Sequence, residues 1–322
     1  MRAEGARELN LQSPELSLVR PDSFPTYYPP KIINLPLERA IRRIGGSSIE
    51  RAHAYGSYVS GDAVKDSLMD ILLIVRNPWL FYEEAAACRD IKLGTTNNPG
   101  FHALWSYKKG SYYLATLDLD GSRQKAKIAV ISHDELLKHA RGGRPDPEGK
   151  GMLYQAGRLH KVALPIIFDD TTPEERSEID RAVNRARIDG MWLALGSASR
   201  YFDFDQLAGI YVNLSYAADK RVEKANKSQT LLVRSYDDYW QMFDPMLRCF
   251  EGAGIIRPLT GEPGIYEKRM SLTGEVVRQW LKKSASHAFK VNFFQNIWTM
   301  GPLNGALYGL AKLKRAKIGP KS

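Results

Sequence analysis

Two short features of the sequence could together carry out phosphoryl chemistry. Gly56-Ser57 follows a segment typical of a strand, and Asp70 stands inside the apolar run SLMDILLIV. A tight glycine turn lets backbone amides approach a triphosphate, and a carboxylate can hold the Mg²⁺ that neutralises charge developing on the phosphates. Nucleotidyl transfer needs both features, so the pattern favours that chemistry.

Asp70 lacks the second acid that usually accompanies the metal-binding Asp of nucleotidyltransferases. The polymerase-β-like superfamily usually places a second acid two residues later, on the same side of the strand, and here that position is Leu72. A lone Asp can also be a structural acid. We favour a metal role because an unpaired charge in a buried strand costs on the order of several kcal/mol. Asp66 and Asp118 are candidates for a second metal ligand, whereas Asp120-Gly121 is better explained as a hairpin turn.

Basic side chains suited to phosphate occur downstream. Lys127 begins the apolar segment KIAVIS, where it could grip a phosphate or simply extend from a strand end into solvent. Arg158 and Lys161 are three residues apart, on one face of an expected helix. Two such bases are also common on an ordinary solvated helix face.

The elements that would position these residues follow from periodicity and capping signals. We expect two domains, a mixed α/β (α+β) one and a mostly helical one, within the divisions 1–34 (an extended lead-in), 35–168, 169–285 and 286–322 (a basic tail). Strands are predicted at 50–57, 67–75, 111–132 (two strands with a turn) and 230–234, and helices at 35–46, 77–94, 134–140, 153–161, 173–197, 202–222 and 235–247.

Composition narrows the class of protein. The 322 residues are 43% hydrophobic, which fits a folded protein of about two domains. Two cysteines are too few for a disulfide framework, and no apolar run approaches the length of about 20 residues that spans a bilayer. The N-terminal segment lacks the apolar core of a signal peptide. By elimination, we expect a cytoplasmic protein.

The positive charge is concentrated at the C-terminal end. The net charge is +10, and no Asp or Glu follows Glu275. Leucines at helical spacing, bases and an aromatic side chain suit a segment that lies on an anionic membrane surface. A terminal helix packed on the core, with a solvated basic face, would give the same pattern. The candidate membrane contacts are Trp298, Leu303, Leu307, Leu310, Lys312, Lys314 and Arg315.

Several of these stretches resemble one family. YGS followed by MDILLIV, then KIAVIS, LYQAGRLHK and LSYAADKRV occur in the order found in the mitochondrial-type phosphatidate cytidylyltransferases, named for translocator assembly and maintenance. The similarity covers roughly residues 50–316. In that family the Asp strand continues with apolar residues, as it does here at Leu72. The chain departs from the family motif at Ala218, where the family has Gly.

The resemblance implies a fold, a reaction and a site. The fold would be a polymerase-β-like nucleotidyltransferase domain, a winged-helix-like second domain and a C-terminal amphipathic helix. The reaction would be CTP + phosphatidate → CDP-diacylglycerol + pyrophosphate, with Mg²⁺ as cofactor, at the inner face of the cell membrane. Asp70 and Lys127 would be catalytic, and Asp70 would bind Mg²⁺. Nucleotide contacts would come from Tyr55, Gly56, Ser57, Arg158, Lys161, Tyr216, Asp219 and Arg221.

Two alternatives stay open at this point. One is nucleotidyl transfer to a soluble acceptor, and the other is a non-catalytic basic protein that binds membranes or nucleic acid. We see no recognised nucleic-acid-binding motif, so we expect no nucleic-acid partner. The sequence gives no indication of the oligomeric state.

Overall fold

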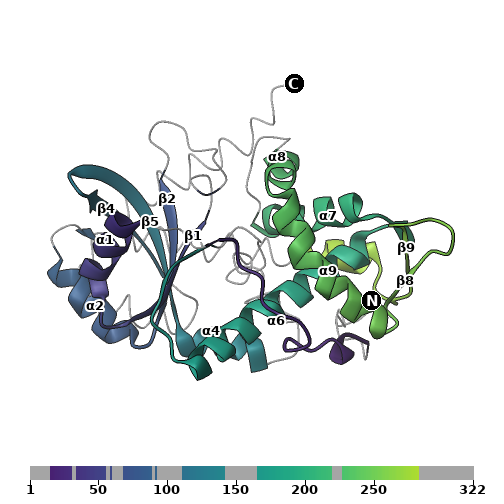
Figure 1. The fold of residues 1–322 in the computed structure, drawn as a ribbon, viewed down its shortest axis with the longest axis horizontal. Coiled ribbons are helices and arrows are strands. Elements are labelled where there is room, and N and C mark those ends of the chain that lie inside the picture. Colours follow the sequence, from purple (N-terminus) through teal and green to yellow (C-terminus); the bar gives the residue numbers. More distant parts are fainter. Residues whose placement is uncertain are drawn as a thin grey trace, which may run out of the picture.

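A computed structural model describes residues 15–30, 34–55, 59, 68–88, 91–92, 111–141, 165–219 and 227–282. Within these ranges the protein has two halves, a mixed sheet with flanking helices and a mostly helical part with a small sheet (Figure 1). The expected mixed α/β class is therefore confirmed.

The larger sheet has the strand order β3-β4-β5-β2-β1-β6. β2 and β5 are parallel, and the other neighbouring pairs are antiparallel. The strands are β1 (Ile49–Tyr55), β2 (Met69–Val75), β3 (Ile91–Lys92), β4 (Ser111–Leu119), β5 (Ser122–Ser132) and β6 (Ile166–Asp169). The predictions for the strands near residues 50, 70 and 111–132 are confirmed.

Helices cover both faces of this sheet, which explains the nearly continuous apolar sequence of β2. Ile71 and Leu73 point into a core shared with α1 (Leu35–Gly45) and α2 (Pro78–Ala87). Leu72 and Ile74 point to the other face, into a core shared with α4 (His133–Arg141) and α6 (Pro173–Ser197). Figure 1 shows α1 and α2 on one side of the sheet and α6 on the other.

Local signals fixed several boundaries. Thr172 and Glu175 form the expected capping box at the start of α6, and the Ser132 hydroxyl accepts a hydrogen bond from the Glu135 amide at the start of α4. β4 and β5 join through Asp120 (φ 54°) and Gly121 (φ 91°), the two left-handed positions of the predicted hairpin turn.

The helical half is built around a second core. It contains α6, α7 (Phe204–Asp219), α8 (Lys227–Arg234), α9 (Tyr236–Gly252) and a three-stranded sheet of order β7-β9-β8. The small sheet comprises β7 (Tyr201–Phe202), β8 (Ile256–Pro258) and β9 (Tyr266–Lys268), and residues 274–282 are also helical. The strand predicted at 230–234 is wrong, because this stretch belongs to α8 and packs Leu231 and Leu232 on the core.

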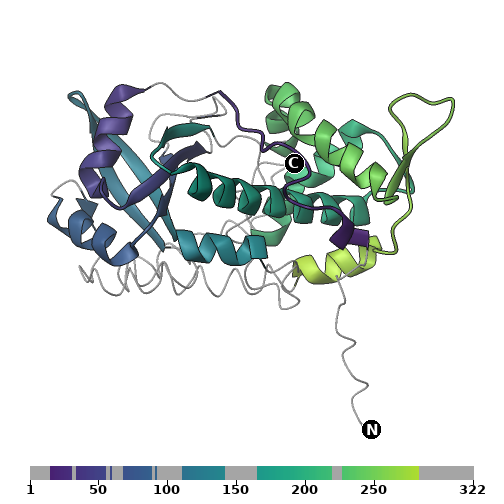
Figure 2. The ribbon, with the colours of Figure 1, turned by 60° about the horizontal axis from the view of Figure 1, so that its bottom comes forward.

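α6 connects the two halves as one uninterrupted helix. Its first part packs Ile179, Ala182 and Val183 against the sheet, while Met191 and Trp192 farther along lie in the helical core (Figure 2). Two cores that share one rigid helix have a fixed relative orientation at this junction.

The N-terminal segment is more than a lead-in. The short 3₁₀ helix η1 (Glu15–Leu18) and the chain after it bury Leu16, Val19 and Phe24 in the helical core. The Asn184 side chain of α6 holds this segment by donating to the carbonyl oxygens of Pro21 (2.8 Å) and Phe24 (3.1 Å). Residues 15–24 therefore pack with the helical half, whereas Tyr28 packs against the core between the sheet and α6.

One buried cation ties the sheet, α6 and the N-terminal segment together. The Arg51 side chain of β1 is 1% exposed and donates to Asp180 (2.8 Å), Asp169 (3.1 Å) and the Tyr28 hydroxyl (3.0 Å). The Tyr28 hydroxyl in turn donates to Asp180 (2.7 Å). Removing one member of a buried ion pair leaves the other charge uncompensated.

We therefore expect Arg51→Gln to lower the free energy of unfolding by about 3–5 kcal/mol. The matched control is Arg176→Gln, since Arg176 also pairs with Asp169 (3.0 Å) but is 52% exposed. Arg176→Gln should lower the free energy of unfolding by no more than about 1 kcal/mol. Urea unfolding of both variants measures the difference, and equal losses would contradict the assigned role of Arg51.

Candidate functional site

Three of the predicted site residues lie side by side on the central strands. Tyr55 of β1 is the register partner of Asp70 in β2, and Asp70 is the register partner of Lys127 in β5. Neighbouring strands are about 4.8 Å apart, so this row places an acid directly between a tyrosine and a lysine. The structure thus brings together residues that the sequence separates widely.

Asp70 and Lys127 project from the same face of the sheet. Leu72 and Ala129 each follow one of them by two residues and lie in the core under α4 and α6, so strand alternation directs Asp70 and Lys127 to that side. Tyr55 also packs in this core and is 7% exposed. The row therefore lies at the margin of this core.

The burial of Asp70 is less complete than the sequence argument assumed. Asp70 is the second residue of β2, and it is only partly buried, whereas the five residues that follow it in the strand are all buried. The free-energy cost of leaving the Asp70 charge unpaired is therefore lower than the sequence suggested, and it is weaker support for a bound metal ion. Its support as a functional residue comes instead from its position beside Lys127.

The second acid of the common site is absent from β2. Leu72 is 5% exposed and lies in the core beside Tyr55 and Ala129, so an acid here would be buried among apolar side chains. Across the described ranges, no group of three or more His, Cys, Asp or Glu side chains is arranged to hold a metal ion. Asp66, the other candidate close in sequence, lies outside the described residues.

Asp118 is not brought to Asp70. The partner of Lys127 on β4 is Leu114, so Asp118 lies four residues farther along the strand, at about 13 Å. Its carboxylate instead accepts a hydrogen bond from the Gly121 amide (2.7 Å), within the β4–β5 turn. Strand alternation directs Asp118 to the same face as Lys127. Its position at the end of β4, however, makes it part of the hairpin turn and not of the row.

The remaining predicted site residues are described in part or not at all. Tyr216 and Asp219 belong to the C-terminal part of α7, and their side chains are not described. The others lie outside the described residues, namely Gly56, Ser57, Arg158, Lys161, Arg221 and the tail residues Trp298, Leu303, Leu307, Leu310, Lys312, Lys314 and Arg315.

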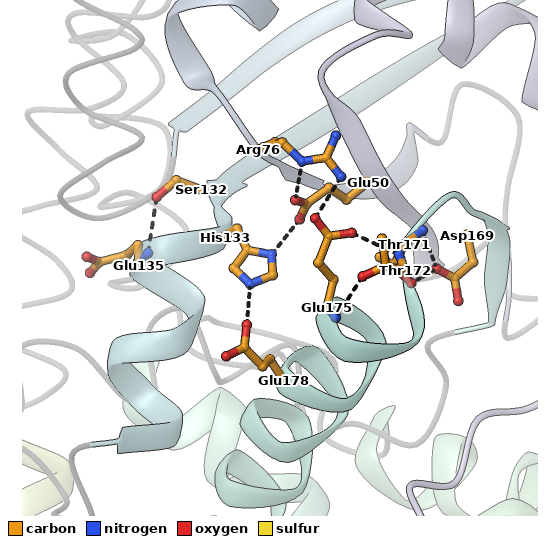
Figure 3. A network of polar contacts seen from close by, with 10 residues as sticks. All are labelled: Glu50, Arg76, Ser132, His133, Glu135, Asp169, Thr171, Thr172, Glu175 and Glu178. Atoms are coloured by element: carbon orange, nitrogen blue, oxygen red, sulfur yellow. Dashed lines mark hydrogen bonds and ion pairs between the residues drawn. The ribbon is translucent and has the colours of Figure 1, made fainter.

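A second polar cluster lies at the opposite end of the same strands (Figure 3). The buried Glu50 carboxylate lies 2.6 Å from Nδ1 of His133 and 3.2 Å from Nε of Arg76. Nε2 of His133 faces Glu178 (3.3 Å), and Arg76 also pairs with Glu175 (2.8 Å). Arg76 follows Asp70 by six residues of extended chain, about 20 Å, so this cluster is separate from the row.

This cluster joins the sheet to α4 and α6. A neutral imidazole has one N–H, so it can donate to both Glu50 and Glu178 only as the imidazolium. The hydrogen bond with Glu50 is the main cause that raises the pKa of His133, against the opposing effect of burial. Sequence reasoning overlooked the cluster because its members are far apart in the chain; the capping signal at Ser132 indicated only that a helix begins there.

A scan against protein-family models finds no match, and a search of curated proteins finds no significant relative. Among the helices that the structure describes, none has the length and apolar character needed to cross a bilayer.

The His133 cluster gives stability a specific pH dependence. The pKa of His133 is higher in the folded protein than in the unfolded chain, where it is about 6.5. The contribution of the protonated imidazole to stability is therefore complete below about pH 6.5 and is lost as the pH rises through the folded-state pKa. We expect the free energy of unfolding to fall across that range in the unmodified protein. His133→Gln should remove this component, which urea unfolding at a series of pH values measures. Identical pH profiles for the two proteins would contradict the assignment.

Proposed function

We propose that this protein is a magnesium-dependent phosphatidate cytidylyltransferase that makes CDP-diacylglycerol and pyrophosphate from CTP and phosphatidate. The observation that carries the proposal is the Tyr55–Asp70–Lys127 row, in which a carboxylate and a lysine are adjacent on neighbouring strands. In the sequence, Gly56-Ser57 follows directly on Tyr55. The resemblance of the surrounding motifs to the mitochondrial-type cytidylyltransferases supports the choice of substrates.

The donor set at the row is compatible with Mg²⁺. This ion commonly keeps several waters and is bound through one or two carboxylates together with substrate phosphate oxygens. A single Asp70 carboxylate, with the triphosphate supplying further oxygens, therefore fits its requirements. When bound, the ion would orient the triphosphate and neutralise charge on the leaving pyrophosphate.

The chain's own groups would have distinct tasks in the reaction. A phosphate oxygen of phosphatidate attacks the α-phosphorus of CTP in line, and the bond from that phosphorus to the pyrophosphate oxygen breaks with its electron pair leaving on pyrophosphate. Lys127 would donate hydrogen bonds to the phosphate oxygens on which negative charge develops as pyrophosphate leaves. Asp70 would hold the Mg²⁺ that positions the triphosphate. No covalent intermediate with the protein is needed.

The lipid substrate requires access to a membrane. The acid-free, basic C-terminal sequence after Glu275 suits contact with anionic lipids at the inner face of the cell membrane. We propose a cytoplasmic, peripheral location on this basis. CTP and phosphatidate are the proposed partners, and transfer to a soluble acceptor is the alternative for the same site.

The test is an assay of the full-length protein with labelled CTP, Mg²⁺ and vesicles containing phosphatidate. We expect CDP-diacylglycerol from the unmodified protein, none from Asp70→Asn, and a kcat about 10²–10³-fold lower for Lys127→Met. Asp118→Asn is the matched control, since it makes the same change about 13 Å along the strand direction and should retain activity.

Circular dichroism and urea unfolding check that each variant is folded. Lack of lipid product from folded, unmodified protein would refute the proposal, and CMP transfer only to soluble acceptors would favour the alternative. Retained activity in Asp70→Asn would refute the proposed metal role of Asp70.

A further inference from the structure

A cluster of arginines lies on the outer face of the small sheet. Figure 1 shows β8 and β9 of this sheet at the opposite end of the molecule from β2. Glu267 stands at the centre of β9, between its register partners Tyr201 of β7 and Arg257 of β8. Their neighbours Phe202 and Ile256 are buried in the helical core. Strand alternation therefore directs Tyr201, Glu267 and Arg257 together to the opposite, outer face.

Three arginines converge on the Glu267 carboxylate. Arg200 approaches one oxygen at 2.8 Å, and Arg257 approaches the other at 2.7 Å, with Arg269 3.6 Å from that second oxygen. The Glu267 side chain is only 8% exposed, whereas the arginines are 71%, 54% and 47% exposed. The carboxylate is thus covered by guanidinium groups that themselves face solvent.

The positive charge exceeds what pairing with Glu267 requires. One guanidinium would neutralise the carboxylate, so three leave a local charge of +2. A guanidinium has five N–H donors, and Arg200 directs two of them to Glu267 while Arg257 directs one. Hydrogen bonds to Glu267 hold Arg200 and Arg257 in place while most of each side chain stays exposed. Guanidiniums held in this way are suited to phosphate, because less side-chain entropy remains to be lost on binding.

We propose that Arg200, Arg257 and Arg269 form a docking platform for the phosphate groups of anionic phospholipids in a bilayer. Tyr201 favours a bilayer, since this half-exposed ring lies beneath the Arg200 guanidinium (5.4 Å) and aromatic side chains are enriched at membrane interfaces. Nucleic-acid phosphate would satisfy the same guanidiniums, and the test below separates the two.

The start of the basic C-terminal sequence lies on the inner side of the small sheet, beneath β9. The ammonium group of Lys268, next to Glu267, donates to the Gly196 carbonyl oxygen (3.3 Å). A Cβ added to Gly274, at the start of helical residues 274–282, would lie 3.7 Å from that same oxygen. Lys268 is the register partner of the buried Ile256, so the acid-free sequence after Glu275 begins on the inner side of the small sheet, opposite the platform. Both the platform and this sequence carry the charge that anionic lipid attracts.

The platform rests on its own geometry and not on the proposed catalytic activity, so we test it by binding. The full-length protein is sedimented with phosphatidylcholine vesicles that contain phosphatidate, and with vesicles of phosphatidylcholine alone. Each base near an anionic surface strengthens binding about fivefold, so Arg200→Gln should weaken binding to the anionic vesicles by about fivefold and Arg200→Gln/Arg257→Gln by roughly 30-fold.

The matched control is Arg248→Gln, which removes an equally exposed arginine (75%) that pairs with Asp244 on α9. It should bind anionic vesicles like the unmodified protein. The single variant Arg200→Gln leaves Glu267 paired with Arg257 and Arg269, so it keeps the test decisive if the double variant does not fold.

The outcomes are distinct. Weaker binding of the platform variants to anionic vesicles alone, with the control unchanged, supports the proposal. Unchanged vesicle binding, or an equal loss in Arg248→Gln, overturns it. The proposal is also overturned if the platform variants lose binding to duplex DNA or inorganic phosphate but still bind anionic vesicles like the unmodified protein. Cytidylyl transfer to a soluble short-chain phosphatidate, assayed in parallel, shows whether catalysis succeeds or fails independently of docking.

Discussion

The Arg51 guanidinium is the contact on which the arrangement of the two halves depends. It is almost fully buried, and it joins β1 to β6 through Asp169 and to α6 through Asp180. Tyr28 closes the arrangement by bonding to both Arg51 and Asp180, which adds the N-terminal segment. A buried cation tolerates few geometries, because every partner must be present to offset its desolvation. It therefore fixes where α6 crosses the sheet.

α6 crosses central strands that carry the Glu50–His133 cluster at one end and the proposed site row at the other. α6 begins beside the Glu50–His133 cluster, where Arg76 and Glu175 also meet, and its first turns cover the sheet from that end (Figure 3). The Tyr55–Asp70–Lys127 row lies at the other end of the same strands, where Asp70 is only partly buried. One face of the sheet thus carries both a core and, at its margin, the partly buried Asp70 beside Lys127.

Local sequence features were sufficient for much of the fold. The Thr172 capping box, the Asp120-Gly121 turn and the apolar run of β2 each depend on residues within a few positions of one another. One exception is 230–234, where a short apolar run suits either a strand or one side of a helix and only packing on the helical core decides between them. Another is the helix predicted at 77–94, which ends at Ala87 and is followed by β3 at Ile91–Lys92. The partial exposure of Asp70 was likewise unpredictable, because it depends on where the strand begins and which helices cover it.

The candidate site shows the division most clearly. By itself, the sequence determined which residue types are available, namely a Gly-Ser pair, an acid within an apolar run and a lysine before another apolar run, since these are properties of short segments. The structure places Lys127 in the middle of β5 and not at its start. Only the tertiary structure decided that Lys127 is the neighbour of Asp70 and that Asp118 belongs to a turn. Strand pairing sets both, and parallel pairing of β2 with β5 joins segments that no local signal relates. The arginines around Glu267 meet for the same reason, because three separate parts of the chain bring them to one carboxylate.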